Sequence, residues 1–176
     1  MDRLILLIGA SGSGKTAVAK ELEKEGYNII QSYTTREKRR TEEWGHIFAD
    51  ITDIINTPSD NIIAFQEVYE GVYYWATKEQ YEGYGDSIYI VCPDGAKNVK
   101  DRLKYDDVEI LTIYLQSDKN VRWKRMMYDR DKQQLDSRLE ADRDKFQIVE
   151  ADYTIDGNLD LDVVVDNLTE LLNRRE

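Results

Sequence analysis

The sequence predicts an α/β protein built as one domain, in which helices flank a parallel sheet. Two observations support this fold class. Continuous apolar runs, typical of parallel strands buried on both faces, recur along the chain, and helical patterns follow most of them. No internal repeat or low-complexity linker interrupts this order. The length of 176 residues suits a single compact domain with a sizeable core.

Strands and helices alternate along the chain. The predicted elements are strands at 4–8, 27–30, 87–91 and 109–115 and helices at 15–24 and 161–174. In the last helix, for example, Leu161, Val164 and Leu168 fall on one face of the helical repeat. Because consecutive elements alternate in type, we expect right-handed crossovers and a parallel sheet.

The segment from 32 to 85 has a different character. It is aromatic and rich in turn residues, and short strands are expected at 61–69 and 71–75. The pattern therefore predicts a small insertion beside the main sheet.

Composition and charge exclude several classes of function. Asp and Glu number 35 against 24 Lys and Arg, so the net charge is -11 and the surface repels phosphate backbones such as those of nucleic acids. The apolar run at 4–8 is too short for a signal-peptide core or a membrane span. A lone cysteine, Cys92, is typical of a reducing compartment and indicates a cytoplasmic protein. A lone histidine, His46, argues against multi-histidine metal sites and Ser-His-Asp chemistry.

A glycine-rich loop stands between the first predicted strand and the first predicted helix. Residues 9–16 read GASGSGKT and fit the P-loop pattern G-x-x-x-x-G-K-[ST]. In such a loop the backbone N–H groups cradle phosphates, the lysine reaches the β- and γ-phosphates, and the Thr hydroxyl can bind Mg²⁺. The residues expected to bind ATP are Gly9, Ser11, Gly12, Ser13, Gly14, Lys15 and Thr16. The fold is therefore expected to be of the P-loop NTPase type.

Half of the positive charge is concentrated in two short windows. Residues 36–40 hold four Lys or Arg and residues 122–145 hold eight, together 12 of 24. Arginine dominates both windows, and its planar fork suits bidentate contacts with phosphate. One window could hold an acceptor's phosphate while the other closes over the donor as a lid. Alternatively, 122–145 is a solvated helical pair whose cations face Asp129, Asp131, Asp142 and Asp144.

Several segments carry the motifs of one protein family. Residues 32–36 read SYTTR and are followed by Arg39 and Gly45. This stretch resembles the S-x-T-T-R-x-x-R segment of the guanylate kinase family. Residues 71–74, GVYY, resemble its G-N-Y-Y hairpin, and further matches are Gly95, Arg130, Arg138 and Leu139. The resemblance runs from about residue 4 to 160.

The resemblance implies a three-part nucleoside monophosphate kinase that transfers the γ-phosphoryl of Mg·ATP to a monophosphate. Its core would comprise 1–31, 83–122 and 145–176, its acceptor-binding insertion 32–82 and its helical lid 123–144. By position, Ser32, Arg36, Arg39 and Tyr74 would hold the acceptor's phosphate. The implied catalytic residues are Lys15, Arg36, Arg130 and Arg138.

The base-reading part departs from the family. Phe65 and Ala76 stand where guanylate kinases have a glutamate and a Ser or Thr, and neither side chain can form hydrogen bonds. Gln66, Glu67 or Glu70 could substitute if the strand register differs by a residue. Cys92 replaces an aspartate of the family, and Asp94, two residues on, could reach the Mg²⁺ water shell. We therefore expect an acceptor nucleotide other than plain GMP.

Two other functions are also compatible with the sequence. Some guanylate-kinase-like domains bind proteins and have lost catalysis, but the P-loop and arginines here are intact. A P-loop phosphotransferase for a non-nucleotide acceptor is the second alternative, favoured by the missing base contacts. The expected partner is a nucleoside monophosphate substrate, and no binding to nucleic acid or membrane is expected. The protein itself is expected to be a monomer or a homodimer.

Overall fold

The computed structural model describes residues 1–38, 41–128 and 132–174. Its elements, in chain order, are β1 (Asp2–Ile8), α1 (Lys15–Lys24), β2 (Asn28–Ile30), β3 (Ser32–Thr34), β4 (His46–Phe48), α2 (Ile51–Asn56), β5 (Ile62–Tyr69), β6 (Val72–Thr77), the 3₁₀ turn η1 (Lys78–Gln80), β7 (Asp86–Val91), α3 (Pro93–Leu103), β8 (Val108–Gln116), α4 (Lys119–Met126), α5 (Lys132–Lys145), β9 (Tyr153–Asp156) and α6 (Leu161–Asn173). None of the helices described is both long and apolar enough to cross a membrane.

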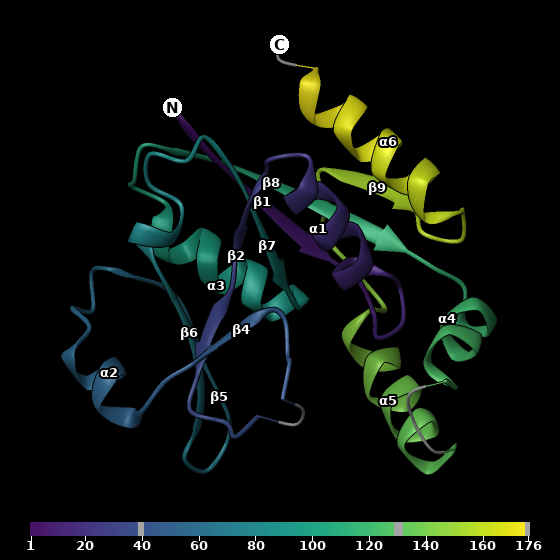
Figure 1. Ribbon diagram of the computed structural model, residues 1–176, viewed down its shortest axis with the longest axis horizontal. Coiled ribbons are helices and arrows are strands. Elements are labelled where there is room, and N and C mark those ends of the chain that lie inside the picture. Colours follow the sequence, from purple (N-terminus) through teal and green to yellow (C-terminus); the bar gives the residue numbers. More distant parts are fainter. Residues whose placement is uncertain (39–40, 129–131, 175–176) are drawn as a thin grey trace.

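The main sheet is parallel and has five strands in the order β2-β7-β1-β8-β9 (Figure 1). β1 lies at its centre, with Ile5 opposite both Ile88 of β7 and Leu111 of β8. Helices cover both faces of this strand, which is why its sequence is a continuous apolar run rather than an alternating one. The fold class predicted from the sequence is confirmed.

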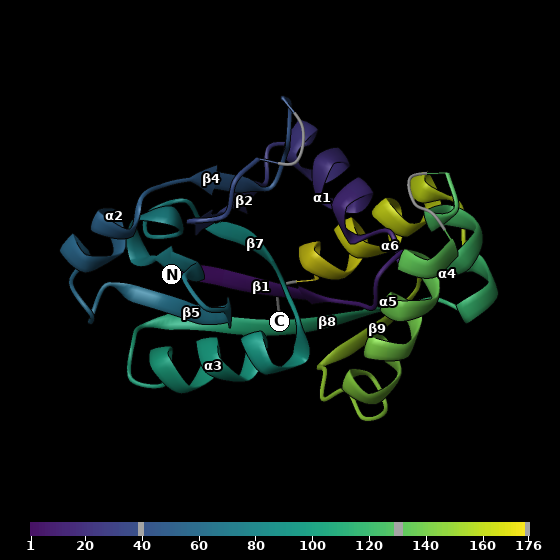
Figure 2. The ribbon, with the colours of Figure 1, turned by 90° about the horizontal axis from the view of Figure 1, so that it is seen from below.

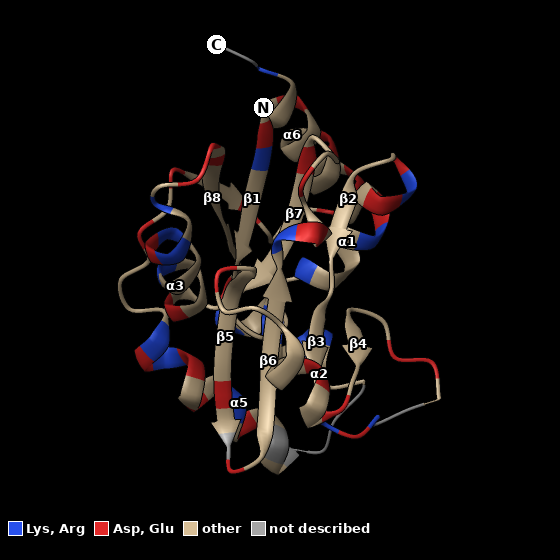
Figure 3. Cartoon of the chain, turned by 90° about the vertical axis from the view of Figure 1, so that its left-hand side faces the viewer, with Lys and Arg blue, Asp and Glu red and all other residues tan. Residues whose placement is uncertain are grey.

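Two apolar layers enclose the main sheet (Figure 2). The Ile5 and Leu7 side chains pack with those of α1 and α6, while Leu4, Leu6 and Ile8 pack with those of α3 on the opposite face. Successive residues of a strand point to opposite faces, so β1 supplies both layers. Figure 3 shows that charged residues gather on helices and loops, whereas the strands carry few of them.

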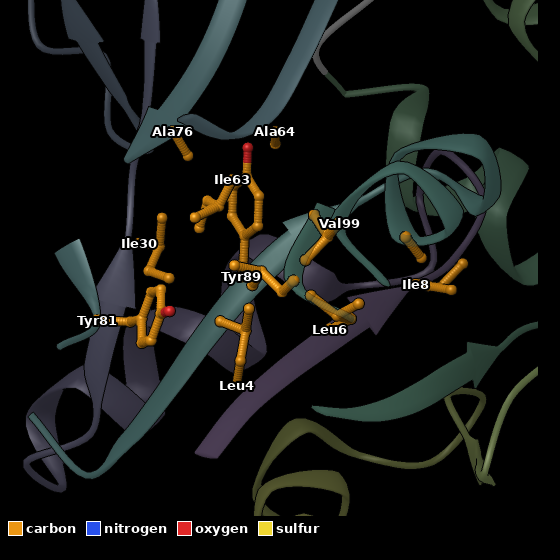
Figure 4. Packing of buried hydrophobic residues seen from close by; sticks show 12 residues of the cluster. Leu4, Leu6, Ile8, Ile30, Ile63, Ala64, Ala76, Tyr81, Tyr89 and Val99 are labelled. Atoms are coloured by element: carbon orange, nitrogen blue, oxygen red, sulfur yellow. The ribbon is translucent and has the colours of Figure 1, made fainter. Parts of the chain in front are cut away.

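The predicted insertion is a second, mixed sheet of four strands in the order β4-β3-β6-β5. The strands expected at 61–69 and 71–75 correspond to β5 and β6, an antiparallel hairpin that turns at Gly71. Trp75 is 1% exposed and stacks on Tyr33 with ring centroids 5.3 Å apart, which ties β6 to β3. This sheet contributes Ile63, Ala64 and Ala76 to the same core cluster as Leu4 (Figure 4).

Helices α4 and α5 form a separate small unit. Met126 of α4 packs with Leu135 and Leu139 of α5 and with half-buried Trp123. Figures 1 and 2 show α5 and the four-stranded sheet on opposite sides of one end of the main sheet. Any ligand bound at that end would therefore lie between the two.

Candidate functional site

The loop between β1 and α1 depends on glycine at three positions. A Cβ at Gly9 would lie 2.5 Å from the Ser13 Oγ and 2.9 Å from the Leu115 carbonyl oxygen. Gly12 has a φ of +78°, and a Cβ there would lie 2.8 Å from the Arg122 carbonyl oxygen. Gly14, with a φ of +104°, begins α1. The loop thus curls tightly against α4 and presents backbone N–H groups at a helix N-terminus, as phosphate binding requires.

Lys15 folds back over this loop. Its Nζ donates hydrogen bonds to the Gly9 carbonyl and, at 3.1 Å, to the Ala10 carbonyl. Burial lowers the pKa of Lys15 to about 8, because a desolvated ammonium is disfavoured, although the nearby Asp142 carboxylate opposes this shift. The ammonium therefore stays protonated at neutral pH and is surrounded by oxygen atoms that a phosphate can replace.

A cavity of about 410 Å³ opens beside the loop. Its polar side consists of Gly12 to Thr16, and its apolar side consists of Leu115, Met126, Leu159, Leu161 and Val164. Gly157 also lines it, where a Cβ would collide with the Ser117 Oγ. Phosphate groups suit the polar side and a nucleobase suits the apolar side.

Arg125 on α4 is a site residue that the sequence reasoning passed over. It lines the cavity, and its Nη1 donates to the Ser13 carbonyl at 3.1 Å. Arg122, one turn earlier, donates to the Ser11 carbonyl at 3.3 Å. Because residues three apart share a helix face, their spacing within the 122–145 window was a usable signal.

Of the two arginines expected on the lid, the structure describes only Arg138. Arg138 lies on α5, is half-buried and has no hydrogen bond within the described part of the chain. Arg130 lies outside the described residues, as does Arg39. Asp142, also on α5, is only 9% exposed and accepts a hydrogen bond from the Ser11 N–H at 2.7 Å. Asp142 is therefore buried at the loop, whereas the alternative interpretation of 122–145 made it a solvent-exposed partner of the helix's own cations.

Arg36 and Tyr74 meet on the four-stranded sheet. The Arg36 Nε donates to the Tyr74 hydroxyl at 2.9 Å, and its Nη1 and Nη2 donate to Glu43 at 3.2 and 2.5 Å. The Glu43 hydrogen bond is the main cause that raises the pKa of Arg36. At 7% exposure, this guanidinium is held rigidly in the bidentate geometry that a phosphate would also use.

Three cavities follow one another along the end of the main sheet. Thr16 lines both the 410 Å³ cavity and a neighbouring one of about 110 Å³. Ser32, His46 and Tyr89 line both this second cavity and a third of about 190 Å³. The Ser32 hydroxyl lies 2.8 Å from the Tyr89 hydroxyl. Ligands commonly bind at the carboxyl ends of parallel strands, where this row of cavities lies.

The third cavity contains one of the two residues expected to read the base. Phe65 lines it, is 38% exposed and stacks on Tyr73 with centroids 5.8 Å apart. Ala76 is fully buried in the core and does not line this cavity. Asn98 of α3 does line it, and its Oδ1 accepts from the Phe65 N–H at 3.3 Å. Sequence reasoning missed Asn98, since no motif marks it.

The donors available for Mg²⁺ are few but suitable. Within residues 1–38, 41–128 and 132–174, no three His, Cys, Asp or Glu side chains group closely enough to hold a metal. Mg²⁺ beside a nucleotide needs only one or two protein ligands, because phosphates and water supply the rest. Thr16, exposed at the start of α1, fits this requirement. Asp94 is exposed in the first turn of α3, which Cys92 caps by accepting from the Gly95 N–H.

Comparisons with known proteins place this geometry in context. The chain resembles the crystal structure of guanylate kinase from Anaplasma phagocytophilum, with a TM-score of 0.69, 18% identity, and coverage of 97% of this chain and 84% of that one. An uncharacterized protein from Eubacterium ventriosum matches with a TM-score of 0.54 and 13% identity over 99% of this chain and 100% of that one. APE1195 matches with a TM-score of 0.52 and 17% identity over 97% and 94%.

At such low identities these structures establish the fold alone. No curated protein sequence matches the chain. A model of the family described as guanylate kinase matches residues 1–175, nearly the full length. The chain therefore belongs to the guanylate kinase family.

Proposed function

We propose that this protein is an ATP-dependent nucleoside monophosphate kinase whose acceptor is a nucleotide other than plain GMP. The observation that carries this proposal is the row of three cavities, in which Thr16 lies between the P-loop cavity and the cavities lined by Ser32. A donor phosphate on the loop and an acceptor phosphate near Ser32 would then approach each other directly. Close alignment of donor and acceptor is the main requirement of phosphoryl transfer.

The charged side chains suit the two ends of this reaction. Lys15 and Arg125 lie at the loop, where they would bind the oxygens of the donor's phosphates. Arg36 would exchange Glu43 for the acceptor's phosphate, with Tyr74 keeping the guanidinium oriented. Arg138 would stabilise the charge on the group in transit. Mg²⁺, held through Thr16 and phosphate oxygens, would neutralise charge on the β- and γ-phosphates.

The composition of the third cavity supports an acceptor other than GMP. Its lining contains no Asp, Glu, Lys or Arg among the described residues, and it includes Phe65, Gln66 and Asn98. Guanine presents adjacent N–H donors that a carboxylate would recognise, and the described lining residues contain no carboxylate. Because the Phe65 N–H engages the Asn98 Oδ1, the Asn98 amide group is left to donate to an acceptor atom of the ligand.

The first experiment measures ADP release from Mg·ATP with a panel of ribo- and deoxynucleoside monophosphates, together with sugars and phosphonates as non-nucleotide acceptors. Lys15→Ala serves as the blank and Lys24→Ala, an exposed lysine on the same helix, as its matched control. We expect turnover with one class of monophosphate other than GMP, lost in Lys15→Ala and kept in Lys24→Ala. Fastest turnover of GMP would contradict the specificity, and turnover of sugars or phosphonates alone would favour a non-nucleotide acceptor.

A further inference from the structure

Asp142 connects three segments that are distant in the sequence. Its Oδ2 accepts from the Ser11 N–H of the P-loop at 2.7 Å and from the Arg122 Nη1 of α4 at 3.3 Å. The same Arg122 Nη1 lies 3.3 Å from the Ser11 carbonyl oxygen, so both backbone groups of Ser11 are engaged. The Asp142 and Arg122 side chains are each 12% exposed. A carboxylate this deeply buried is retained only where such partners compensate its lost hydration.

This contact fixes the position of α5 relative to the loop. The apolar contacts of α5 are a small cluster in which Leu135 and Leu139 face α4. That cluster attaches α5 to α4 but contains no P-loop residue. The Asp142 hydrogen bond therefore sets how close α5 lies to the bound donor.

Arg138 shares the helix face of Asp142. The two residues are four positions apart, and Leu135, Arg138, Leu139 and Asp142 follow the i, i+3, i+4, i+7 spacing of a single helical face. Asp142 is the residue of that face that contacts the P-loop, and Arg138 lies one helical turn before it. An anchor one turn away is close enough to control where the guanidinium reaches.

We propose that Asp142 is a positioning residue: by anchoring α5 to the Ser11 N–H, it places Arg138 against the phosphoryl group in transit. This inference rests on the kinase activity proposed above. The opposite role for the same carboxylate is competition with the nucleotide's phosphates for the loop. The two roles give opposite results when the carboxylate is removed.

The test is steady-state kinetics of Asp142→Ala and Asp142→Asn with the acceptor that the panel identifies. We expect Asp142→Ala to lower kcat about 10- to 100-fold, as expected for a misplaced catalytic group, while KM for ATP changes less than about 3-fold. Asn keeps an oxygen that can accept from the Ser11 N–H but loses the charge facing Arg122, so Asp142→Asn should lose less. Asp144→Ala, on the same helix but 71% exposed, is the matched control and should match the wild type.

A double variant shows whether Asp142 acts through Arg138. In an Arg138→Lys background, we expect Asp142→Ala to lower kcat by less than about 2-fold, because the guanidinium that Asp142 positions is absent from both proteins. An equal loss in both backgrounds, or an unchanged kcat in Asp142→Ala, would overturn the inference. So would tighter ATP binding without loss of kcat, which would indicate competition with phosphate.

Hydrogen exchange at the Ser11 amide separates this inference from the proposed function. We expect exchange to speed up in folded Asp142→Ala and to stay slow in Asp144→Ala, whether or not the protein turns over. Unchanged protection in Asp142→Ala would overturn the anchor itself. A wild type that turns over no acceptor would contradict the kinase proposal and, with it, the role of Arg138, while the exchange result would still decide whether the anchor exists.

Discussion

At the scale of single residues, the site consists of charges held by the chain's own groups. Lys15 contacts loop carbonyls, Arg36 contacts Glu43 and Arg122 contacts Asp142. Each of these partner oxygens accepts hydrogen bonds from a cationic side chain, as a phosphate oxygen could do in its place. Under the proposed function, substrate phosphates would enter a network of side chains that is already oriented, so binding would require little further side-chain ordering.

Lys15 gives a prediction of pH dependence. Its pKa is lowered to about 8 by burial, so the free enzyme loses the loop's positive charge as the pH rises through 8. Because kcat/KM for ATP reports the free enzyme, we expect it to fall as the pH rises, with an apparent pKa equal to that of Lys15. Bound phosphates favour the protonated amine, so kcat should persist to higher pH.

A pH series from 6 to about 10 checks this expectation, since it spans the free-enzyme pKa. Lys15→Arg, whose side chain stays charged throughout, is the control and should lose the alkaline fall in kcat/KM while being slower overall. A wild-type kcat/KM that stays flat to pH 10 would show that another group carries the charge.

Glu43 gives a prediction of stability. Glu43→Gln removes the charged partner of a buried guanidinium, so the free energy of unfolding should fall by about 1–3 kcal/mol. Inorganic phosphate should restore more of that stability in the variant than in the wild type, because it supplies the missing anion. Urea unfolding with and without phosphate measures this, with exposed Glu42→Gln as control. Equal stability of Glu43→Gln and wild type would contradict a structural role for the pair.

At the scale of elements, the strands buried inside the main sheet could be predicted from the sequence. β1, β7 and β8 lie inside the main sheet, and their apolar runs were found from sequence alone. β3, β4 and β9 have three or four residues with little buried surface, so they exist because a neighbouring strand pairs with them. α3 was not predicted because its first turn contains Pro93 and Gly95, which are typical of turns.

The candidate site divides in the same way. The P-loop is a local motif, so its residues could be identified from the sequence, and they lie between β1 and α1 as expected. The contact between Ser11 and Asp142 spans 131 residues and arises only through tertiary packing. Arg125 and Asn98 likewise acquire their places from the packing of α4 on the loop and α3 on β5. Spacing places Arg122 and Arg125 on one helix face, but it carries no signal for what that face, or Asn98, contacts.

The register of β5 and β6 yields a specificity prediction. Phe65 pairs with Trp75 and lines the third cavity, whereas Ala76 pairs with Ala64 in the core. We therefore expect Phe65→Glu alone to raise kcat/KM for GMP, since it places a carboxylate at the cavity. Ala76→Ser should instead lower stability by about 1–3 kcal/mol, because it buries a hydroxyl.

Comparing kcat/KM for GMP with that for the natural acceptor measures this switch. Val68→Glu is the matched control, because Val68 lies on the same strand, is 50% exposed and does not line the cavity. A rise in GMP turnover in Val68→Glu as large as in Phe65→Glu would contradict the assignment of the third cavity to the base.

At the scale of the whole molecule, the four-stranded sheet and helices α4 and α5 flank one end of the main sheet. Tyr89 reaches from β7 toward Ala64 and Ala76 of the second sheet, so a common core cluster joins the two sheets there (Figure 4). The acidic surface, with a net charge of -11, disfavours anions elsewhere. Under the proposed function, nucleotides would therefore bind at this end, beside Arg36, Arg122 and Arg125.

Binding at that end should stabilise the fold. A ligand at 100 times its Kd adds about 2.7 kcal/mol to the free energy of unfolding. We expect Mg·ATP to raise the Tm of the wild type by several degrees and to have little effect on Lys15→Ala. Thermal unfolding with increasing Mg·ATP measures both, and equal shifts in the two proteins would place the nucleotide away from the loop.

Transfer of the labelled γ-phosphoryl of ATP tests the central claim most directly, because it distinguishes direct transfer from hydrolysis. Wild type, ATP labelled at the γ-phosphorus and the preferred monophosphate are mixed, and the labelled products are identified. The row of cavities joined by Thr16 predicts that the label appears in a nucleoside diphosphate, with little free phosphate. Label recovered only as free phosphate, or retained in ATP with every acceptor, would contradict the account.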